Sequence, residues 1–271
     1  MTTEANLIYG DAGGRPLHAD LYRPDQANGA GVLMIHGGGW RQGNKEMVRR
    51  QATALVGHGF TCLACEYRLT GESTWPAQIH DVKAAMRWFR NEAGALGLDV
   101  ARLGALGNSA GGHLALTLAG TVGLADYEGE SGTPGVDTSV GAVIAVYPAV
   151  KFHVGERTSG ANNAEAILGK NPDPAEAERA GPINHVTGDF PPTCFVHGNG
   201  DKVVPPSASL NFYNALVQAG ATAELHMYAE TPHAWARWPN WIEPTMSQAG
   251  VFLRRYLVGE EQWGEPAPGW E

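Results

Sequence analysis

Short apolar runs recur along the chain and end at glycine, proline or polar residues. Apolar runs of this kind are Val32–His36, Thr61–Glu66, Arg102–Leu106, Val140–Tyr147 and Cys194–His197, and Ala223–Tyr228 closes the series. Such runs are expected of strands that are buried on both faces of a parallel sheet. Two earlier runs, Leu7–Tyr9 and Leu17–Tyr22, have no helical segment between them. The sheet is therefore predicted to begin with an antiparallel pair.

Segments with apolar residues at helical spacing lie between the later runs. In Pro76–Gly94, for example, Ile79, Val82 and Phe89 fall on one helical stripe. The other segments of this kind are Lys45–His58, Ala110–Gly120, Ser207–Gly220 and Glu243–Leu257. The alternation of strand and helix predicts the α/β fold class, with a doubly wound, mostly parallel sheet that carries helices on both faces.

Two stretches, Val122–Thr138 and Lys151–Asp189, interrupt this alternation and are rich in glycine, proline, asparagine and acidic residues. We interpret both as excursions above the carboxyl ends of the strands, where long connections shape the mouths of active sites. The whole chain, residues 1–271, is thus predicted to be a single domain without a large cap. A loosely held tail is expected from about Gly259.

Charge and composition narrow the range of partners and compartments. The 271 residues include 19 Lys plus Arg and 28 Asp plus Glu, which gives a formal net charge of −9. An acidic chain without a long basic stripe is not expected to bind nucleic acid as its main partner. No apolar stretch approaches the length of a membrane span, and the N-terminus lacks the pattern of a secretory signal.

The cysteines favour a reducing compartment. Their number, three, is odd, which argues against a disulfide framework and predicts a cytoplasmic location. Cys62 and Cys65 form a C-x-x-C, but they lie inside a predicted strand, where alternation points them to opposite faces. We therefore interpret them as core-filling residues rather than as a redox or metal site, and no metal site is predicted.

The segment around Ser109 carries the strongest chemical signal. Gly107-Asn-Ser-Ala-Gly111 is a G-x-S-x-G motif directly after a predicted strand and directly before a predicted helix. A turn this tight requires small residues two positions before and after the serine, and it exposes the hydroxyl at the positive end of the helix. The alternative is a serine that only caps a helix in a glycine-rich turn.

A glycine loop follows an earlier strand and supplies a second part of a hydrolase site. His36-Gly-Gly-Gly-Trp40 matches the loop type that turns a backbone N–H toward an oxyanion. The predicted donors are the amides of Gly38, Gly39 and Ala110, with the amide of Trp40 as a rival. Binding of a nucleotide phosphate is the alternative for such a loop, but neither a G-x-G-x-x-G nor a P-loop Lys-Ser/Thr is present. His36 is interpreted as an organiser of the loop.

Asp201 and His233 complete a predicted triad with Ser109. In a fold of this kind the acid and then the histidine follow the serine along the chain. His233 lies in a loop just after the final predicted strand, whereas the histidines at 113, 197 and 226 lie in or beside regular elements. Asp201 follows a strand and a Gly-Asn-Gly turn, where it can hold the imidazole in one tautomer. A turn-forming role is the alternative for Asp201.

Taken together, these motifs resemble the esterase/lipase branch of the α/β-hydrolase superfamily. The resemblance is closest to hormone-sensitive-lipase-like and bacterial feruloyl-esterase-like carboxylesterases, and runs from about residue 15 to about residue 257. Its motifs are His36-Gly-Gly-Gly-Trp40, Tyr67-Arg-Leu69, Trp75-Pro-Ala-Gln-Ile-His-Asp-Val-Lys83, Gly107-Asn-Ser-Ala-Gly-Gly-His113, His197-Gly-Asn-Gly-Asp201 and His233. It implies an eight-stranded sheet, no cofactor, and hydrolysis of a small-molecule ester through an acyl-enzyme.

The chain departs from this pattern at a few positions. Asn108 stands where many such esterases have Asp, Glu or Gly, and His233 is followed by Ala-Trp rather than Gly-Phe or Ala-Phe. The long N-terminal helical cap of hormone-sensitive-lipase relatives is also missing, which favours the compact group. Candidates for the substrate pocket are aromatic: Trp40, Tyr67 and Trp235 are expected to bind substrate, and Tyr147 and Phe152 are further candidates.

Other functions stay open on the sequence alone. An arylformamidase-like amide hydrolase would use the same groups, and so would a peptidase. A ligand-binding module without catalysis is the alternative from another class, but such a module would be expected to have lost a member of the triad. A homodimer is compatible with the sequence.

Overall fold

The computed structural model describes residues 1–155 and 164–259. Its centre is one eight-stranded sheet with the strand order β1-β2-β4-β3-β5-β6-β7-β8. The strands are β1 (Thr2–Asp11), β2 (Pro16–Arg23), β3 (Gly31–Ile35), β4 (Thr61–Cys65), β5 (Leu103–Asn108), β6 (Val143–Val146), β7 (Thr193–Gly198) and β8 (Ala223–Tyr228). β1 and β2 pair antiparallel, as do β2 and β4, and the remaining pairs are parallel. The predicted antiparallel start and parallel remainder are both confirmed.

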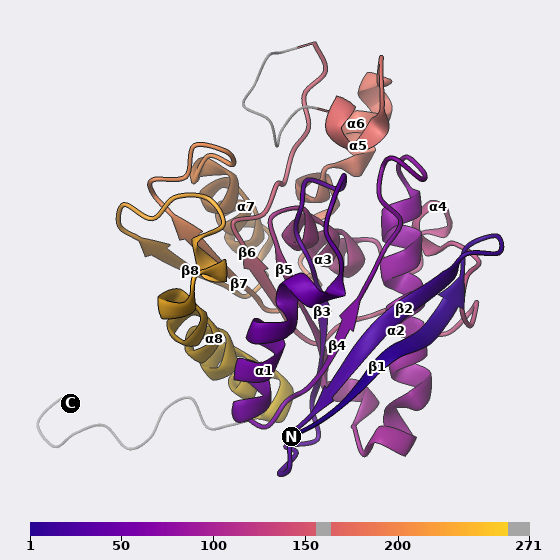
Figure 1. Ribbon diagram of the computed structural model, residues 1–271. Helices are drawn as coiled ribbons and strands as arrows, with labels where there is room; N and C mark the ends of the chain where they lie inside the picture. Colours follow the sequence, from indigo (N-terminus) through magenta and orange to yellow (C-terminus); the bar gives the residue numbers. More distant parts are fainter. Residues whose placement is uncertain (156–163, 260–271) are drawn as a thin grey trace, which may run out of the picture.

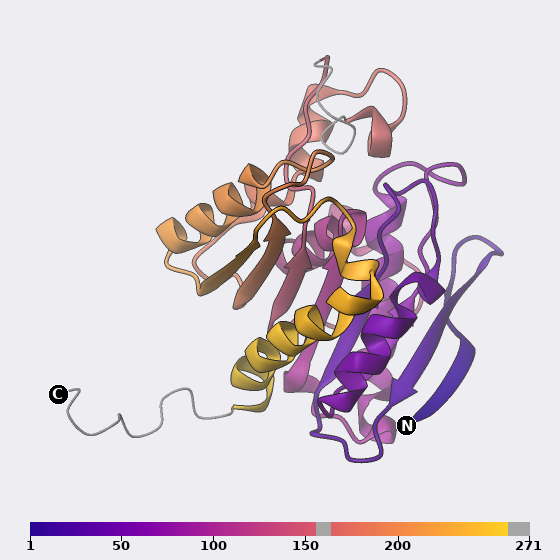
Figure 2. The same cartoon turned by 60° about the vertical axis from the view of Figure 1, so that its left-hand side comes forward.

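Helices cover both faces of the sheet (Figures 1 and 2). The α-helices are α1 (Arg49–Gly57), α2 (Ala77–Leu96), α3 (Ala110–Gly120), α4 (Ala125–Glu128), α5 (Glu165–Leu168), α6 (Pro174–Ala180), α7 (Ser207–Ala219) and α8 (Pro239–Leu253). Short 3-10 turns are η1 (Lys45–Val48), η2 (Val100–Arg102), η4 (Pro182–His185) and η5 (Trp235–Arg237), and a π-helical turn, η6 (Arg254–Val258), follows α8.

Two hydrophobic layers separate the sheet from its helices. Residues of α1 and α8 pack on one face, and residues of α2, α3 and α7 pack on the other. Cys62 and Cys65 lie on β4 in different layers, which confirms that alternation sends them to opposite faces. Both are free and fully buried, and burial raises the pKa of each thiol, so they act as small core residues.

The opening strand is longer than its apolar pattern predicts. β1 begins at Thr2, although only Leu7–Tyr9 reads as an apolar run, and most of its side chains are exposed. The reason is that β1 is the edge of the sheet and pairs with one neighbour only, so backbone hydrogen bonds rather than burial define it. At the other end, the apolar stretch Val140–Tyr147 narrows to the four residues of β6.

The two interruptions of the pattern differ in their positions. The later one contains α5, α6 and η4, and of these α5 and α6 lie above the carboxyl ends of the parallel strands in both views (Figures 1 and 2). The earlier one contains α4, where Glu128 forms ion pairs with Lys83 and Arg87 of α2. Residues 156–163 of the later stretch, and the predicted tail beyond Gly259, lie outside the described residues. Among the helices that are described, none is long and apolar enough to cross a membrane.

Candidate active site

The nucleophile candidate Ser109 sits on a strained turn between β5 and α3. Its φ is 54° and its ψ is −116°, a region that L-residues seldom occupy and that costs about 1–3 kcal/mol. A Cβ on Gly107 would lie 2.0 Å from the carbonyl oxygen of Gly111, and one on Gly111 would lie 2.1 Å from that of Ile35. Only glycine fits at these two positions. The G-x-S-x-G pattern therefore reflects a steric requirement of the turn.

Ser109, His233 and Asp201 form one continuous hydrogen-bonded chain. Ser109 Oγ lies 3.0 Å from His233 Nε2, and His233 Nδ1 lies 2.6 Å from Asp201 Oδ2. These distances fit an imidazole that donates through Nδ1 to the carboxylate and accepts the serine proton through Nε2. The imidazole of His233 is 16% exposed, whereas the carboxylate of Asp201 is fully buried. A substrate can thus reach the serine and the histidine but not the acid.

The buried carboxylate of Asp201 is surrounded by hydrogen-bond donors. Burial alone would raise its pKa, but hydrogen bonds from His197 and His233 outweigh that effect and hold the pKa well below its ordinary value. The other oxygen, Oδ1, accepts from the backbone N–H groups of Val203 and Val204 at 2.8 and 2.9 Å. Asp201 therefore stays ionised at neutral pH and is held in one orientation.

His197 is the one member of this arrangement that the sequence did not single out for the site. Its Nε2 lies 3.3 Å from Asp201 Oδ2 and 3.1 Å from the carbonyl oxygen of Val204, and its Nδ1 lies 2.7 Å from Ser209 Oγ. The side chain is fully buried. The sequence position of His197 could have indicated this role, because His197 lies near the end of β7, four residues before Asp201.

The glycine loop after β3 lies beside the serine. Gly38 and Gly39 have φ values of 119° and 62°, and a Cβ on Gly38 would lie 1.9 Å from the carbonyl oxygen of Gln42. Within the described part of the chain, the amides of Gly38 and Gly39 donate no backbone hydrogen bond, so both are available to a ligand. The amide of Ala110, the first residue of α3, is one of the free donors at a helix start.

The buried histidines near this loop have structural roles. His36 donates from Nδ1 to the carbonyl oxygen of Gly37 at 2.7 Å and stacks on Tyr67 with 4.2 Å between ring centroids. His113 bonds Trp40 Nε1 at 3.2 Å and the carbonyl oxygen of Ala180 at 2.8 Å. Burial lowers the pKa of each histidine to about 4, so both are neutral at pH 7. The prediction that His36 organises the loop is confirmed.

A cavity of about 330 Å³ opens above Ser109 and His233. Trp40, Met47 and Val48 form an apolar wall of this cavity. Ala166 of α5 also lines it, so the later of the two excursions contributes to the mouth. The earlier excursion contributes no lining residue among those described, so the expectation that both stretches shape the mouth holds only for the later one. Of the three aromatic residues expected to bind substrate, Trp40 lines the cavity.

The other two aromatic candidates, Tyr67 and Trp235, are wrong as substrate contacts because they do not line the cavity. The hydroxyl of Tyr67 donates to the carbonyl oxygen of His36 at 3.0 Å, and its ring is buried behind the glycine loop. Trp235 is fully buried and packs against Tyr147, Tyr228 and Trp241. Both residues are therefore buried core residues that pack beside the site.

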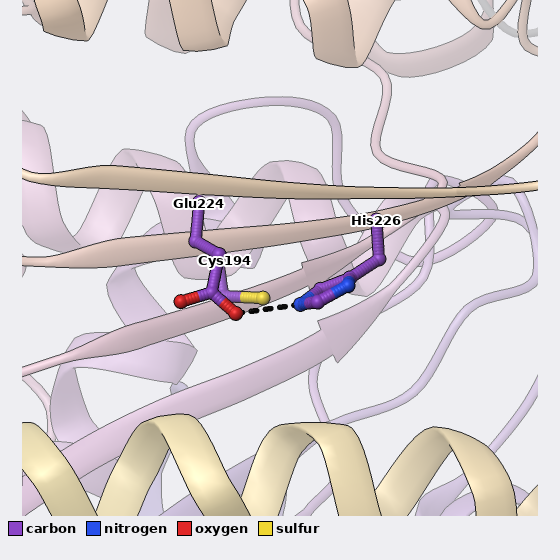
Figure 3. A group of neighbouring side chains, drawn as sticks. All are labelled: Cys194, Glu224 and His226. Carbon is purple, nitrogen blue, oxygen red and sulfur yellow. Dashed lines mark hydrogen bonds and ion pairs between the residues drawn. The ribbon is translucent and has the colours of Figure 1, made fainter. Parts of the chain in front are cut away.

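One group of side chains in the described part of the chain could offer ligands to a metal ion. Cys194, Glu224 and His226 place ligand atoms within 4.8 Å of one another (Figure 3). Glu224 is already bonded to His226 and to Arg255, and burial raises the pKa of the Cys194 thiol, which keeps it neutral. The guanidinium of Arg255 thus balances the negative charge of the Glu224 carboxylate. Cys194 and Glu224 also lie near the amino ends of β7 and β8, at the opposite end of the strands from Ser109.

Comparisons with known proteins agree with this geometry. A family model described as BD-FAE matches residues 19–216. The probable carboxylic ester hydrolase LipM of Mycobacterium tuberculosis is 31% identical over 246 residues, which cover 84% of this chain and 54% of LipM. The esterase LipQ of the same organism is 32% identical over 85% of this chain and 56% of its own length. The chain thus spans about half the length of the curated relatives it matches.

Solved structures of esterases share the whole fold. A truncated form of a carbohydrate esterase from gut microbiota has a TM-score of 0.82 at 27% identity, over 93% of this chain and 96% of that one. A thermophilic esterase, esterase 2 of Thermogutta terrifontis, has a TM-score of 0.81 at 25% identity, over 96% of this chain and 95% of that one. Another structure of that enzyme has it phosphonylated by sarin.

Proposed function

Because the chain belongs to the BD-FAE family of α/β-hydrolases, we propose that it is a serine carboxylesterase that hydrolyses small carboxylic esters through an acyl-enzyme. The observation that carries this proposal is the unbroken hydrogen-bonded chain from Ser109 through His233 to Asp201, of which Ser109 and His233 line a cavity. A ligand-binding module would have no need of this arrangement. The esterase names of the relatives support the same reaction.

In the first half of the reaction, Ser109 Oγ attacks the ester carbonyl while His233 Nε2 takes the serine proton. Asp201 stabilises the imidazolium that forms, because its carboxylate stays ionised and lies 2.6 Å from His233 Nδ1. The amides of Gly38, Gly39 and Ala110 would hold the negative oxygen of the tetrahedral intermediate. His233 then returns the proton to the leaving alcohol, and an acyl-serine remains.

In the second half, water replaces the alcohol. His233 Nε2 removes a proton from the water as it attacks the acyl carbonyl, and the same amides stabilise the second tetrahedral intermediate. Collapse of that intermediate returns the proton to Ser109 and releases the carboxylic acid. The 16% exposure of the imidazole of His233 leaves a path for this water.

Replacement of the nucleophile tests the proposal. Ser109→Ala is expected to lower kcat for 4-nitrophenyl acetate by roughly four to six orders of magnitude, because no acyl-enzyme can form. Comparison of the wild type on an acetyl ester and on the matching acetanilide separates an esterase from an amide hydrolase: the ester should be the faster substrate. Undiminished ester hydrolysis in Ser109→Ala would refute the assignment. A cytoplasmic location stays a prediction.

A further inference from the structure

The charge of the cavity differs in sign from the charge of the protein. The chain carries a formal net charge of −9, yet the residues that line the cavity include Arg41 and Arg237 and no Asp or Glu. Both arginines are exposed, and neither forms an ion pair with a described residue. Most other arginines of the described chain are bonded to carboxylates or carbonyl oxygens, for example Arg68 to Asp81 and Arg90 to Ser139. The positive charge at the mouth is therefore available to a ligand.

A buried hydroxyl without a partner lies in the wall of the same cavity. Tyr147 is 1% exposed and lines the cavity, and its hydroxyl has no hydrogen-bond partner among the described residues. Its ring centroid lies 4.8 Å from that of His233, so the side chain is next to the reacting groups. An unsatisfied buried hydroxyl is unfavourable by about 1–3 kcal/mol, and an acceptor on a bound ligand would remove that cost.

Tyr147 and Arg237 are also close enough to influence each other. Burial raises the pKa of the Tyr147 phenol, which therefore stays protonated and can donate a hydrogen bond, while the charge of Arg237 acts against this rise. Tyr147 and Arg237 both line the cavity, and a neutral hydroxyl donor together with a guanidinium is the kind of pair that recognises a carboxylate.

We propose that the preferred substrate is an ester that carries a second, ionised carboxylate, which Arg41, Arg237 and the Tyr147 hydroxyl bind. The proposal rests on the proposed esterase function and specifies its substrate class. The carboxylate would be held beside the ester carbonyl that Ser109 attacks, so the charged group orients the substrate. The apolar wall of Trp40, Met47 and Val48 would hold the chain or ring that joins the two groups.

The test compares charged and neutral esters of equal size. 4-Nitrophenyl hydrogen adipate and 4-nitrophenyl hexanoate differ by the carboxylate on the acyl half, and 3-acetoxybenzoate and its methyl ester differ by a carboxylate on the alcohol half. In at least one pair the charged ester is expected to have a kcat/KM about tenfold higher, the size of effect for a hydrogen bond to a charged group. A ratio at or below one in both pairs, with the neutral esters still hydrolysed, would overturn the proposal. Failure of all four esters would instead count against the esterase itself.

Variants locate the effect on the proposed residues. Arg237→Gln, Arg41→Gln and Tyr147→Phe are each expected to lower the charged-to-neutral ratio of kcat/KM several-fold, and the double arginine variant should bring it close to one. Arg102→Gln is the matched control, because it removes the same charge at η2, just before the start of β5 and far from Ser109 at its end. An equal loss in Arg102→Gln, or an unchanged ratio in all three site variants, would show that no local carboxylate site exists.

Discussion

His197 Nε2 lies 3.3 Å from Asp201 Oδ2, the same oxygen that accepts the hydrogen bond of His233. Two histidines therefore converge on one carboxylate oxygen, one of them fully buried and the other partly exposed to the cavity. His197 is fixed in turn by Ser209 and by the carbonyl oxygen of Val204. This arrangement gives His197 the role of a positioning residue for the acid of the triad.

Replacement of His197 should therefore affect turnover more than binding. His197→Leu removes the donor and is expected to lower kcat by about 10- to 100-fold with little change in KM, because the freed carboxylate orients His233 less well. His197→Gln keeps an N–H donor at similar reach and should restore a large part of kcat. Steady-state kinetics with a thermal melt of each variant check this. Equal losses in both variants, in proportion to lost stability, would indicate a purely structural role.

The glycine loop offers a matched pair of substitutions. Gly38→Ala places a Cβ 1.9 Å from the carbonyl oxygen of Gln42 at a φ of 119°, so the loop must shift and the oxyanion donors with it. Gly39→Ala meets no atom within 4 Å, and its φ of 62° costs an alanine about 1–2 kcal/mol. We expect kcat to fall by at least 100-fold in Gly38→Ala and by far less in Gly39→Ala.

The same assay and a melting curve for each protein check this pair. Circular dichroism should give the same folded spectrum for both variants, since the loop lies outside the helices and strands. Equal activity of the two variants would contradict the assignment of Gly38 to a rigid oxyanion loop.

The protein should lose stability at pH values well above the ordinary pKa of carboxylates. The pKa of His36 and that of His113 are lowered to about 4 in the folded protein, so between about pH 6.5 and pH 4 the unfolded chain binds more protons. Each histidine is then expected to reduce the free energy of unfolding by about 2 kcal/mol between pH 7 and pH 5. Asp201 acts in a lower range: its lowered pKa stabilises the fold above about pH 3.9, and this contribution is lost as the pH falls further.

Urea unfolding at pH 7 and pH 5, together with histidine titrations by NMR, measures these effects. Two imidazoles should stay neutral at pH 5 while the chain is folded. If every histidine titrates near its ordinary pKa and the free energy of unfolding is equal at the two pH values, the result would contradict the burial of His36 and His113.

The sequence was informative where chemistry depends on local geometry. Ser109 lies on a turn that sterically requires the glycines on either side of it. Asp201 and His233 follow strands whose carboxyl ends meet at one edge of a parallel sheet. The bounds of β3, β4 and α3 could likewise be predicted to within one residue from apolar runs and turn residues, whereas β5 ends two residues later and β6 begins three residues later than its run. The long polar edge strand β1 could not, because its pairing rather than its burial defines it.

The substrate pocket was less predictable, because it depends on which way side chains turn in the packed molecule. Tyr67 and Trp235 are as aromatic as Trp40, but they face the core. Arg41 and Arg237 read as ordinary surface residues until the loops after β3 and β8 bring them to one cavity. The second hydrogen bond to Asp201 from His197 likewise requires the tertiary structure.

The most direct test of the account is covalent labelling of Ser109. A fluorophosphonate reacts with a serine that is activated by a neighbouring base, so intact-protein mass spectrometry should show one phosphonyl group per chain and peptide mapping should place it on Ser109. Labelling should be abolished in Ser109→Ala and strongly slowed in a His233→Ala variant. A label on another residue, or no label on a folded protein, would contradict the central claim that Ser109, His233 and Asp201 form a working acyl-transfer site.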